Sequence, residues 1–373
     1  MRAEREGERG VALLIVILTV ALLTVSVMEF TYSTQVEYRR TAHWLKARKA
    51  ETLAESGVMI ARTLLEYEYN LKRALRGATG GEANDPVITG LTDMWARFCQ
   101  DDGFPSCPSS KPTSCEIDTG DGGLALRIED ETGRFNLNRL ARANQRGVRG
   151  PEFDMLDRLL LIGELDPTLA GPIVDWVDTS DATYAFGPGA ESPEYYALDL
   201  PYGPRNRPFE TLRELALVAG IGTEELGRLR RLVNTVDPEA ENAKTFNINT
   251  APVEVLRAFD GGSLEPFLNP ILNERCREPF KSLDDLKERL EGLPASVNGS
   301  WIHFESTWFR VRATGHVDDV YQSAEAVVAR TDVGFRLLYY LPRRGPNIGG
   351  VDMSESTGID ELARFSLESG GLK

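Results

Sequence analysis

The feature that most constrains this chain is an uninterrupted apolar run near its start. Residues Val11 to Met28 (VALLIVILTVALLTVSVM) contain no charged side chain over 18 positions. As an α-helix this run would be about 27 Å long, close to the roughly 30 Å hydrocarbon core of a bilayer. Because no other segment resembles it, we expect a single membrane span, with everything after Glu29 on one side of the membrane.

The apolar run lacks the features of a cleaved secretory signal peptide. Signal peptides have a shorter apolar region that ends in a small-x-small cleavage site, whereas here Glu29-Phe30-Thr31-Tyr32 follows. Small and apolar residues then continue at helical spacing, with no proline before Pro86: Ala50, Leu53, Ala54, Gly57, Val58, Ala61, Leu64 and Leu65. We therefore predict one helix over residues 11–76, with its first half in lipid and its second half packed against a soluble head.

Composition narrows the classes of function. The chain has 42 Lys and Arg against 57 Asp and Glu, a net charge of −15, so its overall electrostatics repel nucleic acid and anionic lipid headgroups. Its hydrophobic fraction of 42% and charged fraction of 27% are those of a globular protein. We expect two or three folded units, and neither a polytopic membrane protein nor a general DNA binder.

Strand-like segments lie on both sides of a long middle region. Leu124 to Glu129 alternates apolar and polar residues, as a half-buried strand does, and further strand-like runs cover residues 309–314, 323–330 and 335–341. Strand-like segments thus lie both before and after residues 131–295.

That middle region contains an internal repeat. Phe135-Asn136-Leu137-Asn138 recurs as Phe246-Asn247-Ile248-Asn249, and the segment that begins Pro208-Phe209 recurs as the one that begins Pro279-Phe280. Each copy is predicted to form short helices and resembles a helix-hairpin-helix unit. In competence-type DNA receptors, whose NINTA signature is present here, such units contact DNA. The acidic surroundings favour a scaffold or protein-contact role instead.

The start of the chain resembles the leader of type IV pilins and type II secretion pseudopilins. In that family a prepilin peptidase cuts after a glycine, here Gly10, and methylates the new N-terminus, here Val11. Most members have Glu at the fifth mature position, where it is thought to pair with the N-terminal amine of a neighbouring subunit, but this chain has Ile15. A carboxylate in lipid is retained only with a partner, so a subunit that lacks it is suited to starting or capping a filament.

Four further motifs in order resemble the protein K family of type II secretion minor pseudopilins: IEDETGRFNLNRL, DWVDTSD, FNINTAPVEVL and STWFRVRATG. The resemblance implies an α+β class, with a pseudopilin fold (long N-terminal helix plus small antiparallel sheet) into which a large α-helical domain is inserted. The expected segments are a leader (1–10), the helix (11–76), a first β region (77–130), the inserted domain (131–295, with repeats at 131–236 and 244–295), a second β region (296–341) and a disordered tail (342–373).

The same resemblance implies the partners and the location of the protein. It implies a single span in the inner membrane, with the bulk of the chain in the periplasm. Expected partners are the other minor pseudopilins of the tip, the major pseudopilin, the prepilin peptidase and the inner-membrane assembly platform, with the secretin or an exported substrate as further candidates. No nucleic acid is expected. The alternatives are a membrane-anchored DNA-uptake receptor and a minor pilin of a type IV pilus.

Oxygen ligands gather within the first repeat, on loops rich in Gly and Pro. Carboxylates and carbonyls in such loops suit calcium, which takes six to eight oxygen ligands. We predict Asp178, Asp181 and Glu191 as ligands, with Asp199 behind them, and proteins that resemble this one bind calcium in the inserted domain. The spacing is not that of an EF-hand, so a solvated acidic loop is the alternative. Asp175 is expected to end a helix.

The cysteines and histidines complete the candidate chemistry. Cys99, Cys107, Cys115 and Cys276 would lie in an oxidising compartment, so disulfides are expected; four cysteines allow three full pairings, and no C-x-x-C pair favours zinc. The three histidines, His43, His303 and His316, lack a catalytic motif around them. We therefore expect a protein that is not an enzyme.

Overall fold

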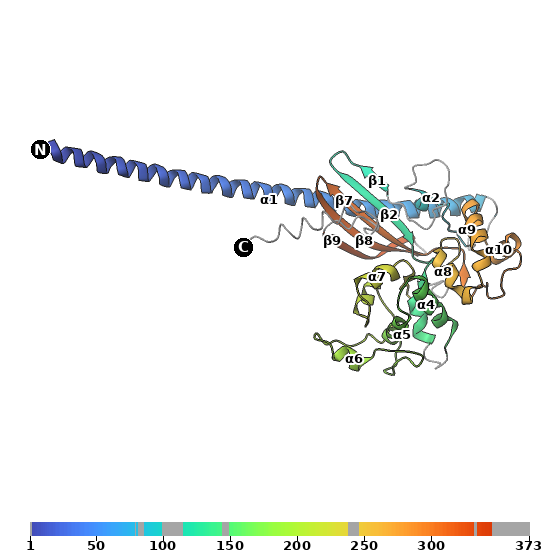
Figure 1. The fold of residues 1–373 in the computed structure, drawn as a ribbon. Helices are drawn as coiled ribbons and strands as arrows, with labels where there is room; N and C mark the ends of the chain where they lie inside the picture. Colours follow the sequence, from blue (N-terminus) through green and yellow to red (C-terminus); the bar gives the residue numbers. More distant parts are fainter. Residues whose placement is uncertain are drawn as a thin grey trace.

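The computed structural model describes residues 2–78, 80, 86–98, 115–143, 149–237, 246–331 and 334–344. One helix, α1 (Arg2–Ala78), occupies the whole N-terminal part, at about 115 Å long. Figure 1 shows its first half extending alone from the head and its second half lying along the strands of the head. Among the described residues, α1 is the one helix long and apolar enough to cross a membrane, and its apolar stretch is exposed throughout.

The second half of α1 packs on a five-stranded antiparallel sheet of order β1-β2-β7-β8-β9. The strands are β1 (Cys115–Asp118), β2 (Gly123–Asp130), β7 (Trp308–Val317), β8 (Val320–Thr331) and β9 (Gly334–Arg344). β2 pairs with β7 although residues 131–307 separate them, so the predicted sheet with strands from both sides of an insertion is confirmed. β9 continues to Arg344, three residues beyond the expected end of the β region.

Small residues let α1 lie close to the sheet. Ala54, Val58, Ala61 and Leu65 are buried in one core with apolar residues of β2, β7 and β8. A Cβ at Gly57 would lie 2.8 Å from Leu124 Cδ1, so a larger side chain would push the helix away from the sheet. The predicted packing stripe is therefore the surface that joins the stalk to the head.

Residues 131–307 form a second part with its own hydrophobic core. Its elements, in chain order, are β3 (Phe135–Asn136), η1 (Leu137–Arg139), α3 (Leu140–Ala143), α4 (Pro151–Ile162), η3 (Pro167–Leu169), α5 (Ala170–Val177), α6 (Ser192–Tyr196), η4 (Leu212–Leu217), α7 (Thr223–Leu229), β4 (Val233–Asn234), β5 (Phe246–Asn247), α8 (Val253–Ala258), η5 (Phe259–Gly262), η6 (Glu265–Phe267), α9 (Leu268–Arg277), α10 (Leu283–Arg289) and β6 (Ile302–His303). α2 (Met94–Arg97) packs on α1 outside this part.

The two sequence signatures of the repeat bind each other in the same way in both copies. In the first, the Asn138 amide accepts from Phe209 N–H (2.7 Å) and donates to the Phe209 carbonyl (3.0 Å). In the second, Asn249 makes the same two bonds to Phe280 (2.8 and 2.9 Å). Each copy also starts with a short strand that pairs in parallel with one near its end, β3 with β4 and β5 with β6. Since β6 reaches His303, this part continues past residue 295, the expected boundary.

Candidate functional site

The membrane helix has the features on which the predicted role depends. Gly10 and Val11 lie inside α1, with side chains outside the described set, and Ile15 lies on the exposed surface of the apolar segment. None of the side chains that the structure describes covers this segment, and such an exposed apolar helix fits a membrane anchor.

The soluble half of α1 also has a face that the head leaves open. Met59, Ile60, Tyr67 and Leu71 are exposed, on the side of the helix away from the buried stripe. Such large apolar side chains at helical spacing, on a helix whose other side is already buried, form a surface suited to a second helix.

Three of the four predicted calcium ligands lie near one another in the loop that follows α5. Asp178 ends the helix, is almost fully buried and accepts from Ser180 N–H (2.7 Å). Asp181 is exposed and accepts from the Asn206 amide (3.0 Å). Glu191 is 1% exposed, and both of its carboxylate oxygens are buried without a hydrogen-bond donor. A buried carboxyl group without donors is stable only if it is protonated or binds a cation.

The pKa of Glu191 also indicates that its negative charge is not compensated by the protein. Burial, followed by the nearby carboxylates of Asp175, Asp178 and Asp181, raises the pKa of Glu191 to about 8. A carboxyl group is held in such a place only if a proton or a bound cation compensates for its charge. Among the described residues, however, no three acidic, His or Cys side chains form a ready-made metal cage. A calcium ion here would need backbone carbonyls or water as further ligands.

Asp175, predicted to end a helix, lies inside the last turn of α5 and belongs to this cluster, whereas Asp178 caps the helix. Asp175 is fully buried in α5 and accepts from Ala190 N–H (2.8 Å), which fastens the returning loop onto the helix. The loop approaches closely because Gly171 and Gly189 have no Cβ; one at Gly171 would overlap the Pro188 carbonyl, and one at Gly189 would overlap the Asp175 carboxylate. Burial raises the pKa of Asp175 to about 6. In the sequence, these glycines are the one sign that the loop approaches α5 closely.

Asp199, the fourth predicted ligand, lies on the exposed stretch after α6 and is not among the carboxylates that chiefly set the pKa of Glu191. The structure therefore brings Asp175 into the cluster and leaves Asp199 at the surface.

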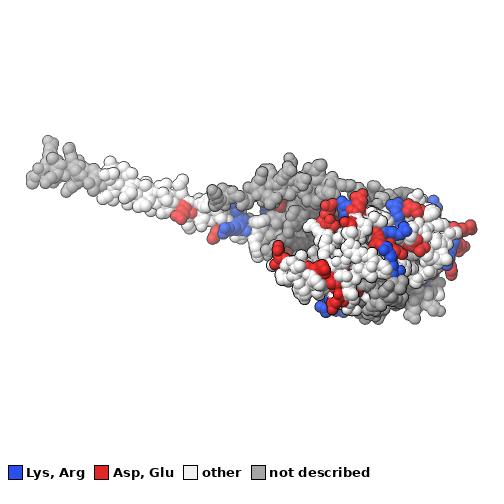
Figure 2. All heavy atoms as spheres, turned by 60° about the horizontal axis from the view of Figure 1, so that its bottom comes forward, with Lys and Arg blue, Asp and Glu red and all other residues white. Residues whose placement is uncertain are grey.

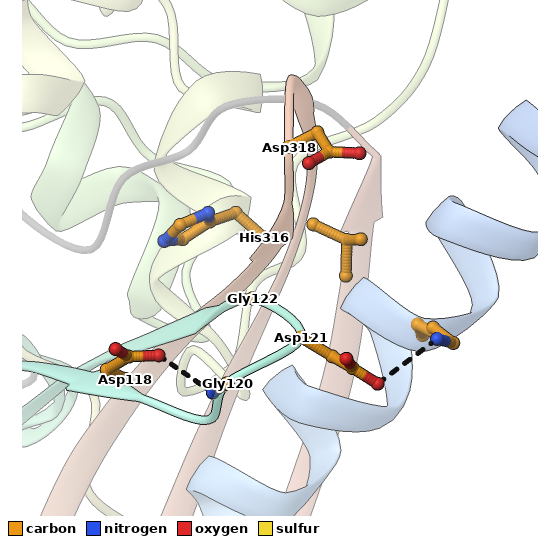
Figure 3. Close-up of a pocket in the computed structure, with 8 residues that line it drawn as sticks. Asp118, Gly120, Asp121, Gly122, His316 and Asp318 are labelled. Carbon is orange, nitrogen blue, oxygen red and sulfur yellow. Dashed lines mark hydrogen bonds and ion pairs between the residues drawn. The ribbon is translucent and has the colours of Figure 1, made fainter.

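A separate hollow of about 500 Å³ lies where α1 leaves the head (Figure 3). Its charges are paired across elements: Lys49 with Asp121 (3.4 Å), and Lys46 with Asp318 (2.9 Å). Asp118 accepts from Gly120 N–H (2.7 Å) within the turn that joins β1 to β2. The two ion pairs attach the β1–β2 turn and the β7–β8 turn to α1, so the residues that line this hollow have a structural role.

The cysteines and histidines are placed as follows. Cys276 is disulfide-bonded; the side chains of Cys99, Cys107 and Cys115 are outside the described set, so the pairing stays a prediction. His43 is exposed on α1, His316 stacks on Tyr321 and His303 is buried in β6. Asn247 and Asn249 of the NINTA signature are fully buried and bond inside the protein.

Comparisons with known proteins agree with this architecture. Two family-level sequence models of type II secretion system protein K match, one over residues 133–238 and the other over residues 246–302. Type II secretion system protein K of Pseudomonas aeruginosa is 31% identical over 314 residues, which are 82% of this chain and 84% of that relative. The Aeromonas hydrophila protein is 24% identical over 341 residues, covering 87% and 93%.

A solved structure shares the fold. A chain in the crystal structure of the GspK-GspI-GspJ complex from the enterotoxigenic Escherichia coli type 2 secretion system matches with a TM-score of 0.55 and 18% identity, over 84% of this chain and 100% of that chain. The identity and coverage of the Pseudomonas relative are sufficient to assign the family. This chain belongs to the protein K family of type II secretion systems, whose members are minor pseudopilins.

Proposed function

We propose that this protein is the tip subunit of the type II secretion pseudopilus, where it initiates or caps the filament during protein export across the outer membrane. The observation that carries the proposal is an acid-free membrane helix joined to a head that is broad at one side of the stalk (Figure 1). In a filament built by stacking helices, such a head leaves room for subunits below it and obstructs those above.

The membrane helix supports the same placement. A Glu at position 15 could reach the N-terminal amine of a subunit already in the filament, and its cost in lipid would be offset by that pairing. Ile15 enters lipid more easily but offers no such pairing, so the subunit has no acidic contact with one above it.

The test of this role is an Ile15→Glu variant with Ile15→Leu as its control. We expect the Glu variant to change pseudopilus length and lower secretion, because it can dock onto other subunits as well as start the filament. The Leu variant should match the parent. Unaltered length and secretion in the Glu variant would contradict the tip role.

We propose that the exposed face of α1 binds the helices of the other minor pseudopilins. The E. coli neighbour is solved in complex with GspI and GspJ, and Met59, Ile60, Tyr67 and Leu71 provide an apolar face of the required kind. A photo-crosslinking amino acid at Tyr67 should give an adduct with another minor pseudopilin in cells. Its absence, with normal expression and insertion, would count against this face.

We propose calcium as the ligand of the cluster after α5, with Glu191, Asp178 and Asp181 as carboxylate ligands. The unpaired oxygens of Glu191 support this assignment. When bound, the ion would neutralise the carboxylates and fasten the loop on α5. A calcium-dependent rise in the unfolding temperature, absent with EDTA, is the expected result.

The remaining proposals follow from the family. We propose cleavage after Gly10 and methylation of Val11 by the prepilin peptidase, contacts with the major pseudopilin and the assembly platform, a head in the periplasm, helix-hairpin-helix geometry for the two repeats, and no enzymatic activity. The buried NINTA residues and the net charge of −15 support a role without DNA.

A further inference from the structure

In the segment from Ala190 to Tyr202, two tyrosines pack on the core of the helical part, and large apolar side chains between them are exposed to solvent. Tyr195 is fully buried, packs edge-on against Trp176 (5.4 Å between ring centroids), and accepts from Ala219 N–H (3.1 Å). Tyr202 packs against Trp176 as well (6.4 Å) and donates to the Leu217 carbonyl (2.8 Å). These two tyrosines fix the segment on the core, so the side chains between them are held in place.

The large side chains between the anchors are exposed and apolar. Tyr196 is 62% exposed, Leu198 45% and Leu200 83%, and Leu217 beside Tyr202 is 47% exposed. We call these four residues the α6 patch. Single exposed leucines are ordinary, but a group of large apolar side chains on a rigid segment marks an interaction surface. Two of the four residues lie beside the same stretch of chain, because Gly203 lies against the Tyr196 hydroxyl and its neighbour Tyr202 donates to the Leu217 carbonyl.

The position of the patch restricts what can reach it. α6 lies on the part of the head farthest to the side of α1, at the end that points back along the stalk (Figure 1). Figure 2 turns this side forward and shows a broad uncharged surface, with carboxylates along the edge nearer the stalk. A molecule seated on α6 would therefore lie beside the stalk, below the overhanging head.

Charge restricts the occupant further. The exposed charged side chains of the segment from Ala190 to Tyr202 are Glu194 and Asp199, and the segment has no Lys or Arg. The next cation, Arg205, is already paired with Glu214 (2.7 Å) and Glu210. A surface that covers the patch gains most if it is apolar at its centre and cationic at its rim.

We propose that the α6 patch is the docking surface for the globular head of the neighbouring pseudopilin, and that this head presents an apolar centre with cationic side chains around it. The proposal rests on the tip role, because in a filament the place beside the stalk and below the tip is occupied by the next subunit. The contact is additional to the helix contact along α1. It holds the overhanging part of the tip against the filament.

Site-specific photo-crosslinking in cells tests the assignment, with the crosslinker at Leu200 of the full chain. We expect an adduct with another pseudopilin. Leu161 on α4, which is 61% exposed and outside the patch, is the matched position and should give none. An adduct with an exported protein or the outer-membrane channel would overturn the proposal, and so would no adduct at all.

The position at Tyr67 separates this proposal from the tip role. If Tyr67 gives a pseudopilin adduct and Leu200 does not, the minor pseudopilin complex stands and the patch is not its docking surface. If neither position gives one, the complex itself is in question, and the patch proposal falls with it.

Variants of the patch provide a quantitative test with the purified full chain in detergent and the other minor pseudopilins as probes. Leu198→Ser combined with Leu200→Ser should weaken association about tenfold or more, as loss of a central apolar contact does. Asp199→Lys should weaken it too, and more at low salt. Because these side chains are exposed, the unfolding temperature should stay near that of the parent. Unchanged affinity in both variants would contradict the proposal.

Discussion

At the scale of residues, the repeat in the sequence is explained by one side chain per copy. Asn138 and Asn249 each bind both backbone groups of a phenylalanine that lies far along the chain. Asparagine is suited to this because one amide provides both a donor and an acceptor. The two signatures therefore recur together because they are two halves of one contact.

Asn249→Ala should destabilise the helical part by about 2–4 kcal/mol, since it leaves a buried N–H and a buried carbonyl of Phe280 without partners. Chemical unfolding is the measurement. Asn70→Ala, at an exposed position of α1, is the control and should stay within about 0.5 kcal/mol of the parent. Equal unfolding midpoints for the two variants would show that the contact is not needed.

Glu191→Gln should stabilise the protein when calcium is absent and should remove the stabilisation that calcium gives to the parent. Without the ion, Gln removes a buried carboxylate that its neighbours repel, so the variant should unfold at a higher temperature than the parent. With calcium at about 100 times its dissociation constant, the parent should gain about 2.7 kcal/mol and the variant little. Asp199→Asn, at the exposed fourth candidate, should keep the full calcium response. A calcium response retained by Glu191→Gln would exclude Glu191 as a ligand.

His303 should make the fold sensitive to acid. Burial lowers the pKa of His303 to about 3, against 6.5 when unfolded. The folded state thus binds fewer protons, so its stability is fully present above about pH 6.5 and is lost as the pH falls toward 3, by up to about 1.4 kcal/mol per pH unit. His303→Phe should flatten this dependence in denaturant unfolding between pH 7 and pH 5. His43→Gln, at an exposed position, should leave it unchanged; a parallel slope in His303→Phe would refute the assignment.

At the scale of elements, a layer of ion pairs joins the sheet to the helical part. Glu131, just after β2, binds Arg310 of β7 (2.9 Å), and Arg230 after α7 binds Glu325 of β8 (2.8 Å). Burial alone lowers the pKa of Arg310, but the carboxylates of Glu131 and Glu325 outweigh it and raise that pKa. Directional pairs of this kind set the orientation of one part on the other more than they add stability.

Glu131→Gln should cost about 3–5 kcal/mol, because two buried cations, Arg310 and Arg134, lose the carboxylate that they share. Replacing both residues, Glu131→Leu with Arg310→Met, should recover most of the loss. Glu265→Gln breaks the exposed pair with Arg257 and should cost at most about 1 kcal/mol. If Glu131→Gln and Glu265→Gln lowered the unfolding temperature equally, the buried ion pairs would contribute no more to stability than the exposed pair.

At the scale of the whole molecule, the stalk and the head meet different surroundings. The apolar first half of α1 is exposed among the residues that the structure describes, whereas one face of the second half is buried in the core of the sheet. A long apolar helix of this kind is consistent with a single-pass membrane anchor. The proposed anchor requires that the N-terminal helix is retained when the proposed leader is removed.

Intact-mass measurement of the mature protein tests that requirement. With active prepilin peptidase, we expect a chain that begins at Val11 and carries one added methyl group. Gly10→Val should retain the ten-residue leader and lower secretion, whereas Gly7→Val, within the leader, should be processed normally. A mature chain that begins beyond residue 28 would contradict the retained stalk.

The sequence alone determined the features that depend on neighbours along the chain. The apolar run, the helical stripe, the alternation in β2 and the paired signatures are local or periodic patterns, and the structure confirms a long helix, an antiparallel sheet on both sides of an insertion, and a duplicated set of contacts. These patterns are readable because each reflects the geometry of one element.

Only the tertiary structure decided which distant groups meet and which lose water. Asp175 joined the acidic cluster and Asp199 did not, because the loop folds back over α5 where glycines permit it. The same holds for the buried oxygens of Glu191, the ionic layer beneath the sheet and the outward side chains of the α6 patch. Burial and charge pairing depend on contacts between residues far apart in the chain; glycines such as Gly171 and Gly189 permit a close approach but do not specify which groups meet.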